Sequence, residues 1–282
     1  MRGSFKKNLI DFLGNKIDEK EKKYLPSGYQ QLGHVIILNL NDQIMEKKEL
    51  IGNATLQIVK NCKTVCIKTG KIQGQFREPQ LEKIAGNGTE TTVIEYGIKY
   101  HFDAMEIMFA KGNINERRRY IDLIEKDEII FDFFAGIGYF TLSIAKDSAA
   151  KRIYAFEINP TAFKYLKKNL ELNSIPSDKV QPIKGDCTVE ALKIEDKADR
   201  ILMGILPSPK SSLETAFKVL NTSAGIIHYE GLLKNDSKAD LLFNDVKKVA
   251  KLFNRNIELK HLENIKSYAP YVQHVCLDIE VR

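Results

Sequence analysis

Glu128-Ile-Ile-Phe-Asp-Phe-Phe-Ala-Gly-Ile-Gly-Tyr-Phe140 is the stretch that decides the fold. Its apolar run, Ile129 to Phe134, predicts a buried parallel strand. The run stops at Ala135-Gly136-Ile137-Gly138, where two glycines allow a tight turn and a close approach to a ligand. A helix is expected to follow at once. Strand, glycine loop and helix open a doubly wound nucleotide-binding sheet, although a lone G-x-G is equally typical of a purely steric turn.

The next unit favours the nucleotide interpretation. Arg152 to Ile158 reads as a second strand, and Glu157 lies near its end, in the zone where such folds place a carboxylate on a ribose. Asn159-Pro160 then predicts the start of a helix, with Asn as N-cap and Pro in the first turn. The alternative is a surface glutamate, but Glu157 directly follows an apolar strand, so the nucleotide site is favoured.

Length and composition describe an ordinary soluble globular protein. The 282 residues, 43% hydrophobic and 28% charged, suit one large domain and one small one. No run is long enough for a membrane span, and no signal-peptide pattern opens the chain. Four scattered cysteines lack zinc-ligand spacing, which predicts reduced thiols in the cytoplasm and no metal. The net charge of +6 is compatible with a nucleic-acid partner.

The first third of the chain predicts a small α/β module. A helix is expected from Phe5 to Tyr24, and a hairpin around Tyr96-Gly97. Between them we expect a strand at His34–Leu40, a helical segment through Val59, a second strand at Thr64–Lys68 and a turn at Gly70–Gly74. The predicted domains are residues 1–26 (N-terminal helix), 27–95 (small α/β domain) and 96–282 (Rossmann-like domain).

Further apolar runs continue the large sheet, and an amphipathic helix lies among them. The runs are Lys179–Asp186, Asp199–Ser208, Gly225–Glu230, Ile257–Ile265 and Val272–Val281, the last expected to pair antiparallel. Ligands in open α/β sheets bind at the carboxyl ends of the strands. The loop Gly204–Pro209 is therefore where a substrate would meet a cofactor. Asp186 can accept a hydrogen bond from an adenine amino group, with the N–H of Cys187 facing the ring.

Three consecutive arginines, Arg117 to Arg119, precede the central strand. On a helix they point in three directions, so they cannot form one face. One of them can reach a ligand carboxylate through a charge-assisted bond, and at least one is plain surface.

Taken in order, these motifs resemble the family of archaeal and eukaryotic tRNA guanosine-37 N1-methyltransferases and their wybutosine-pathway relatives, the aminocarboxypropyltransferases. The matching stretches are Phe109–Arg119, Asp132–Gly138, Glu157–Pro160, Asp199–Gly204, Ile227–Tyr229 and Tyr268–Pro270 with His274. The resemblance implies a class I methyltransferase-like, Rossmann-like α/β fold with a seven-stranded sheet and S-adenosylmethionine as cofactor. It also implies a tRNA partner, modified at position 37 of the anticodon loop. We further expect a cytoplasmic monomer.

The resemblance also implies the cofactor contacts. Glu157 would bind the ribose, Asp186 and Cys187 the adenine, and Arg117 the methionine part. The full implied set is Ala110, Arg117, Asp132, Phe134, Ala135, Gly136, Gly138, Glu157, Ile158, Asp186 and Cys187. Relatives often carry Ser where Ala110 stands and Asn where Cys187 stands, so any contact from Cys187 is expected from its backbone.

The branch of the family depends on Met203-Gly204-Ile-Leu-Pro-Ser208. The methyltransferase branch carries Asn where Gly204 stands, and an Asn carbonyl can hold an N–H nucleophile. The Gly-x-x-Pro-Ser form resembles the archaeal 4-demethylwyosine aminocarboxypropyltransferases. Gly204, Pro207 and Ser208 then form a positioning loop, and the sequence identifies no general base.

Four aromatic or imidazole side chains are weaker candidates for the substrate pocket: His228, Tyr229, Tyr268 and His274. Tyr can stack on a purine, but each of the four can equally belong to the core or surface of a strand. The alternatives to aminocarboxypropyl transfer are N1-methyl transfer and a non-catalytic tRNA-binding module. A nicotinamide-dependent oxidoreductase would require a third glycine after Gly138, and Phe140 and Thr141 provide none.

Overall fold

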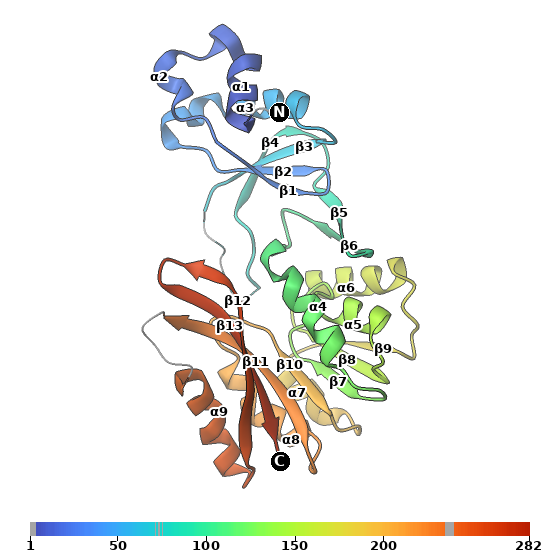
Figure 1. The fold of residues 1–282 in the computed structure, drawn as a ribbon. Helices are drawn as coiled ribbons and strands as arrows, with labels where there is room; N and C mark the ends of the chain where they lie inside the picture. Colours follow the sequence, from blue (N-terminus) through green and yellow to red (C-terminus); the bar gives the residue numbers. More distant parts are fainter. Residues whose placement is uncertain (1–3, 71, 73, 75, 235–239) are drawn as a thin grey trace. The chain divides into compact units, whose positions relative to one another are not determined.

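The computed structural model describes residues 4–70, 72, 74, 76–234 and 240–282. Their contacts group the chain into two compact units, Met1–Phe109 and Ala110–Arg282, each described here by itself (Figure 1). The sequence predicts a boundary between residues 95 and 96. The hairpin of β5 (Glu90–Glu95) and β6 (Ile98–Asp103), which spans that point, falls within the first unit. No described helix is long and apolar enough to cross a membrane.

The first unit contains a four-stranded sheet of order β1-β2-β3-β4. Its strands are β1 (Gln30–Leu32), β2 (Val35–Leu38), β3 (Thr64–Lys68) and β4 (Leu81–Gly86). The central pair is parallel, and the two outer pairings are antiparallel. Between β2 and β3 the chain forms η2 (Asp42–Lys47) and α3 (Lys48–Ile58). The strand at Thr64–Lys68 and the hairpin are confirmed, whereas β4 was not predicted.

Helices cover the small sheet with an apolar core. The expected helix from Phe5 to Tyr24 is divided into α1 (Phe5–Leu13), η1 (Gly14–Lys16) and α2 (Glu19–Lys22). Gly14 causes the division because its φ of 53° is incompatible with an α-helix. Leu9 of α1, Ile51 of α3 and Val65 of β3 belong to one buried cluster. The turn expected at Gly70–Gly74 lies partly outside the described residues.

The second unit contains the predicted seven-stranded sheet, of order β12-β13-β11-β10-β7-β8-β9. Its strands are β7 (Ile129–Asp132), β8 (Arg152–Glu157), β9 (Val180–Lys184), β10 (Arg200–Met203), β11 (Gly225–Lys234), β12 (Ile257–Ala269) and β13 (Val272–Val281). Strands β9, β8, β7, β10 and β11 pair in parallel with one another, whereas β13 pairs antiparallel with β11 and β12. The antiparallel last strand is confirmed.

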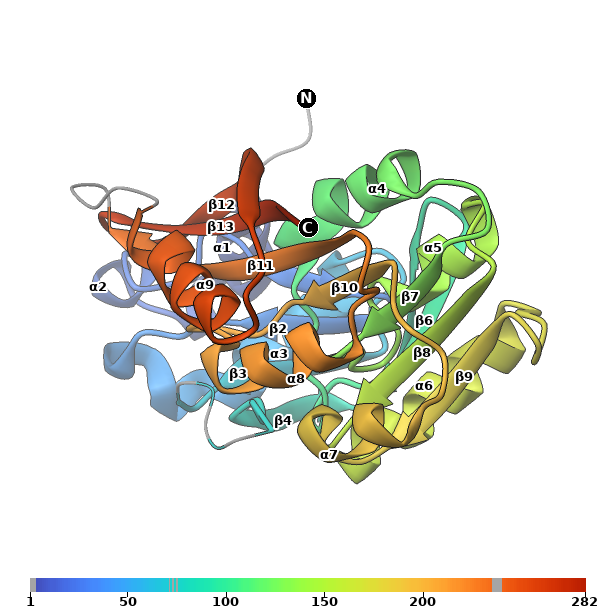
Figure 2. The same cartoon turned by 90° about the horizontal axis from the view of Figure 1, so that it is seen from below.

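Helices lie on both faces of this sheet. They are α4 (Ile114–Leu123), α5 (Thr141–Asp147), α6 (Pro160–Leu172), α7 (Cys187–Glu190), α8 (Leu213–Val219) and α9 (Asp240–Leu252), with short η3 (Lys111–Asn113), η4 (Ala191–Lys193) and η5 (Lys210–Ser212). Figure 2 shows α8 and α9 on one side of the sheet and α4 on the other.

Alternation along the strands assigns side chains to the two faces. Phe131, Tyr229 and Ile279 join the apolar cluster that includes α8 and α9. His228 lies on the opposite face, where its ring meets that of Tyr120 from α4 at a centroid distance of 4.7 Å. That second face is where polar side chains are buried.

Candidate functional site

The carboxyl ends of the parallel strands bring the predicted site segments to one edge of the sheet. Backbone hydrogen bonds connect the loops that leave these strands. The N–H of Phe133 donates to the carbonyl of Leu202 at 3.1 Å, and that of Gly185 donates to the carbonyl of Glu157 at 3.0 Å. This is the edge at which open α/β sheets bind ligands.

The loop after β7 needs its two glycines. Gly136 and Gly138 have φ values of 57° and 97°, in the region that L-residues with a Cβ rarely adopt. A Cβ on Gly136 would lie 2.6 Å from the ring of Tyr139, and one on Gly138 would lie 2.7 Å from Leu142. The expectation that a helix follows at once is wrong, because these dihedrals delay α5 until Thr141.

Asp132 ends β7 and is almost fully buried. Its Oδ2 accepts a hydrogen bond from the hydroxyl of Thr141 at 2.7 Å, and its Oδ1 accepts one from the N–H of Phe134 at 3.4 Å. Burial raises the pKa of this carboxyl to about 7, although both hydrogen bonds oppose the rise. Asp132 therefore joins the strand end to the first residue of α5.

Glu157 ends β8 and bonds to two neighbouring backbone segments. Its Oε2 accepts from the N–H of Gly136 at 2.7 Å, and its Oε1 accepts from the N–H of Asn159 at 2.6 Å. Burial raises its pKa. Because an ionised carboxylate has about four acceptor positions, Glu157 keeps capacity to accept from a ligand hydroxyl. That capacity fits a ribose.

Polar and apolar groups surround the next strand ends. Asp186, an exposed residue, caps α7 by accepting from the N–H of Thr188 at 2.8 Å. The Cys187 side chain is buried, with Sγ 3.6 Å from the hydroxyl of Ser212, and burial raises the pKa of the thiol to about 12. Ile158 is 38% exposed directly after β8. An exposed carboxylate beside an exposed apolar residue suits the amino group and ring of an adenine.

The three arginines have three different environments, as their helical spacing predicts. Arg117 is buried; its Nη2 donates to the carbonyl of Ala110 at 3.0 Å, and its guanidinium lies 5.3 Å from the ring of Tyr139 in the glycine loop. Arg118 is exposed. Arg119 bonds to acidic groups inside the protein. Of the three, Arg117 is the one tied to the glycine loop.

The loop that follows β10 is fixed to β11. The hydroxyls of Ser208 and Tyr229 are 2.7 Å apart, and the carbonyl of Pro207 accepts from the N–H of Leu232 at 3.1 Å. Gly204, half-buried, begins this loop. A Cβ on Gly204 would lie 2.9 Å from Cε2 of Phe140. Little room is therefore left for a side chain at the strand end.

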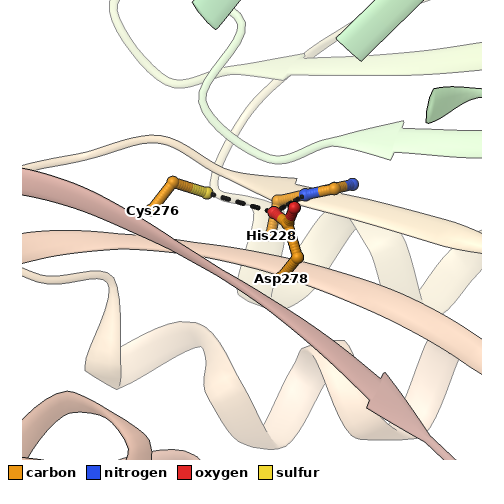
Figure 3. Close-up of side chains that lie close together, drawn as sticks. All are labelled: His228, Cys276 and Asp278. Atoms are coloured by element: carbon orange, nitrogen blue, oxygen red, sulfur yellow. Dashed lines mark hydrogen bonds and ion pairs between the residues drawn. The ribbon is translucent and has the colours of Figure 1, made fainter. Parts of the chain in front are cut away.

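His228, Asp278 and Cys276 form a buried cluster in the sheet (Figure 3). The Nδ1 of His228 lies 2.6 Å from Oδ1 of Asp278, and Arg200 donates to Nε2 of the same ring at 2.8 Å. Arg119 bonds to both oxygens of Asp278. Both ring nitrogens of His228 and both carboxylate oxygens of Asp278 are thus bonded within the protein. The positive charges of Arg119 and Arg200 disfavour a metal cation at this cluster. We interpret the cluster as structural, and substrate contact by His228 stays a prediction.

A second imidazole–carboxylate pair lies one step further along the same strands. Oε2 of Glu230 lies 2.7 Å from Nε2 of His274, and both side chains are 2% exposed. The two residues are diagonal neighbours on β11 and β13, where Glu230 pairs with Cys276. Glu230 is not among the site residues predicted from the sequence; the signal was a single acidic residue within the mainly apolar run Gly225–Leu233. Tyr268, by contrast, is 48% exposed on β12.

Comparison with known proteins assigns the family. A family model described as the TRM5/TYW2 methyltransferase domain matches residues 91–260, and one described as the TYW2 N-terminal domain matches residues 9–89. The chain belongs to the TRM5/TYW2 family. The resemblance drawn from the motifs is thereby confirmed, as is the Rossmann-like fold.

Relatives from both branches of the TRM5/TYW2 family are similar to this chain. A Methanocaldococcus jannaschii protein named tRNA(Phe) (4-demethylwyosine(37)-C(7)) aminocarboxypropyltransferase is 36% identical over 89% of this chain and 96% of its own length. The tRNA (guanine(37)-N(1))-methyltransferase Trm5b of Pyrococcus abyssi is 32% identical over 94% of this chain and 78% of its own. The crystal structure of P. horikoshii TYW2 in complex with MeSAdo superposes with a TM-score of 0.85 at 30% identity, covering 98% of this chain and 99% of that one.

Proposed function

We propose that this chain transfers the 3-amino-3-carboxypropyl group of S-adenosylmethionine to C7 of 4-demethylwyosine at position 37 of tRNA(Phe). The observation that carries the proposal is Gly204, which directly follows β10 and has no side chain. Phe140 leaves little space for one, since a Cβ there would lie 2.9 Å from its ring. The strand-end Asn of the methyltransferase branch is absent, and with it the carbonyl that would hold an N–H nucleophile.

The strand ends fit S-adenosylmethionine. When bound, it supplies a sulfonium that activates both its methyl carbon and its γ-carbon. Glu157 offers free acceptor positions for the ribose hydroxyls. Asp186 and Ile158 suit the adenine, and Arg117 suits a carboxylate. Asp132 anchors the first residue of α5 through Thr141, and Gly136 of the glycine loop donates a hydrogen bond to Glu157.

A tRNA partner is part of the proposal. It rests on the names of the relatives and on the net charge of +6. Position 37 in the anticodon loop, a monomeric enzyme and a cytoplasmic location belong to the same proposal. His228, Tyr229, Tyr268 and His274 are its candidate substrate contacts, with Gly204, Pro207 and Ser208 as the positioning loop.

Methyl transfer to guanosine-37 N1 is the second candidate, favoured by the 32% identity to Trm5b. Two observations weigh against it: Gly204, and the match of residues 9–89 to a TYW2 N-terminal domain. The small-molecule product distinguishes the two. Attack at the γ-carbon leaves methylthioadenosine, whereas attack at the methyl carbon leaves S-adenosylhomocysteine, and mass spectrometry separates them.

A further inference from the structure

One carboxylate oxygen in the second unit is buried without a protein partner. Oε1 of Glu230 has no hydrogen-bond partner among the described residues, and the same holds for Nδ1 of His274. The other atoms of the pair, Glu230 Oε2 and His274 Nε2, are bonded at 2.7 Å. Because a buried, unpaired carboxylate oxygen is costly, such an atom is expected to meet a ligand.

The neighbouring His228–Asp278 pair on the same strands has its polar side-chain atoms hydrogen-bonded within the protein. His228 precedes Glu230 by two residues on β11, so both side chains lie on the same face of the sheet. His228 bonds through both ring nitrogens, to Asp278 and to Arg200. The Glu230–His274 pair resembles it in geometry but leaves one atom of each partner open.

The open oxygen lies beside the end of β10. A Cβ placed on Gly204 would be 3.2 Å from Oε1 of Glu230. Gly204 itself is half-buried, so the backbone next to this oxygen is partly accessible. Glu230 thus presents an acceptor at the strand end where the Asn of the methyltransferase branch would project its side chain.

We propose that Glu230 is the proton acceptor of the transfer reaction, with Oε1 taking the proton of the ring carbon that is alkylated. The inference rests on the proposed aminocarboxypropyl transfer. The ring carbon forms a bond to the γ-carbon while the γ-carbon–sulfur bond breaks and its electron pair passes to sulfur. The carbon–hydrogen bond of that ring carbon then breaks, its electrons return to the ring, and the proton goes to Oε1. The released proton balances the lost sulfonium charge, so no oxidant or reductant is needed.

The surroundings favour a proton on this carboxylate. Burial raises the pKa of Glu230, while its bond to His274 lowers it. A carboxylate whose pKa is raised toward neutrality is a better general base. The titratable groups that act on Glu230 come from α4, β7, β12 and β13: Glu116, Tyr120, Asp132, Lys266, His274 and Cys276. His274 is a positioning residue, since it holds Oε2 and leaves Oε1 directed at the strand end.

The test compares Glu230→Gln with wild type on tRNA that carries 4-demethylwyosine, with hydrogen or deuterium at the attacked carbon. Wild type is assayed first. If it yields no methylthioadenosine, the proposed function fails independently of Glu230. With that activity present, Glu230→Gln is expected to lower the multiple-turnover rate by about 10²-fold or more. It is also expected to raise the deuterium isotope effect above that of wild type.

Two controls separate a base from a binding or structural group. Glu263→Gln alters a glutamate on β12 of the same sheet, 3.0 Å from the ring of His261 near the surface, and should retain the wild-type rate. Calorimetry with S-adenosylmethionine and with methylthioadenosine should give wild-type affinities for both in Glu230→Gln. A loss of affinity for S-adenosylmethionine alone would make Glu230 a ligand of its ammonium group and overturn the proposal. A turnover rate within a few-fold of wild type, or an unchanged isotope effect, would overturn it too.

A second variant serves if Glu230→Gln does not fold. Gly204→Ala keeps the buried charge but places a methyl group beside Oε1, and it should lower turnover with wild-type affinity for methylthioadenosine. Unimpaired turnover would count against Glu230. Because Asp132 and Glu157 are also buried carboxyls with raised pKa values, the infrared titration of the ligand-free protein is read as the difference between wild type and a folded Glu230 variant, Glu230→Gln or Glu230→Asp. That difference should show a buried carboxyl protonated above the ordinary glutamic acid range. A carboxyl that titrates at or below that range would contradict the assignment.

Discussion

The backbone N–H of Gly136 donates a hydrogen bond of 2.7 Å to Oε2 of Glu157, which joins the glycine loop after β7 directly to the carboxylate at the end of β8. Glu157 therefore holds the loop, and in the proposed function the same carboxylate accepts hydrogen bonds from the ribose. Burial to 9% exposure raises the pKa of this carboxyl, and its backbone hydrogen bonds offset part of that rise.

Glu157→Ala is expected to weaken S-adenosylmethionine binding. Each hydrogen bond to a charged acceptor contributes about 1.5–3 kcal/mol, so the loss of one or two predicts a fall in affinity of at least about tenfold. Isothermal titration calorimetry measures it, with Glu195→Ala, an exposed carboxylate of the same unit, as the matched control. Unchanged affinity in a folded Glu157→Ala protein would remove this residue from the site.

Asp132 gives a prediction about pH. Its pKa is about 7 in the folded protein against 3.8 in the unfolded chain, so the folded state holds the proton more tightly. Wild type should lose stability from this group as pH rises from about 4 to about 7. Asp132→Asn cannot titrate there, so its free energy of unfolding relative to wild type should rise across that window, by up to about 1.4 kcal/mol per pH unit. Denaturant titrations at several pH values check this, and a difference that stays flat with pH would contradict it.

Much of the large sheet could be predicted from the sequence, because its strands are short apolar runs bounded by glycine, proline or polar residues. Asn159-Pro160 also predicted the start of α6 correctly, and Asn159 accepts from the N–H of Thr161 at 2.9 Å. By contrast, β4 (Leu81–Gly86) mixes charged and apolar residues without alternation. It forms through long-range pairing with β3, which the local pattern does not encode.

The site was predictable to the same extent. Side chains at or just after a strand end, such as Glu157 and Asp186, could be predicted because the strands themselves could be. Glu230 was missed since the expected strand stopped there, whereas β11 continues to Lys234 alongside β13. Its partner His274 lies far along the chain, and only the sheet register brings the two together.

Asp278→Asn is expected to destabilise the second unit strongly. The change weakens contacts to Arg119 and His228 in a nearly dry environment, and breaking a buried pair of this kind costs about 3–5 kcal/mol. These partners hold the pKa of Asp278 well below its usual value. The stabilisation is therefore present above the ordinary aspartate pKa of about 4 and should shrink as pH falls below it.

Chemical denaturation at neutral and acidic pH measures that difference. Glu258→Gln is the control, because its ion pair with Lys260 is exposed and should contribute only about 0–1 kcal/mol. A cost for Asp278→Asn as small as that of the control would refute a structural role for the cluster.

Gly204→Asn tests whether one residue selects the chemistry. The new side chain would meet Phe140 and Glu230, so it should disturb the strand end rather than create a methyltransferase. A displacement of about 1 Å in the reacting groups is expected to reduce aminocarboxypropyl transfer by about 10²-fold. Initial rates of methylthioadenosine and S-adenosylhomocysteine formation give the answer. Wild-type transfer by Gly204→Asn would show that the strand end tolerates a side chain.

The identity of the small-molecule product distinguishes aminocarboxypropyl transfer from methyl transfer without any substitution in the protein. Purified protein is incubated with S-adenosylmethionine in two separate reactions. One contains tRNA(Phe) that carries 4-demethylwyosine at position 37, and the other contains tRNA(Phe) that carries unmodified guanosine there. Mass spectrometry then identifies the nucleoside released and the mass gained by the tRNA. Aminocarboxypropyl transfer predicts methylthioadenosine and an added aminocarboxypropyl group with the first tRNA alone. S-adenosylhomocysteine formed with the second tRNA, together with a methylated guanosine, would contradict it.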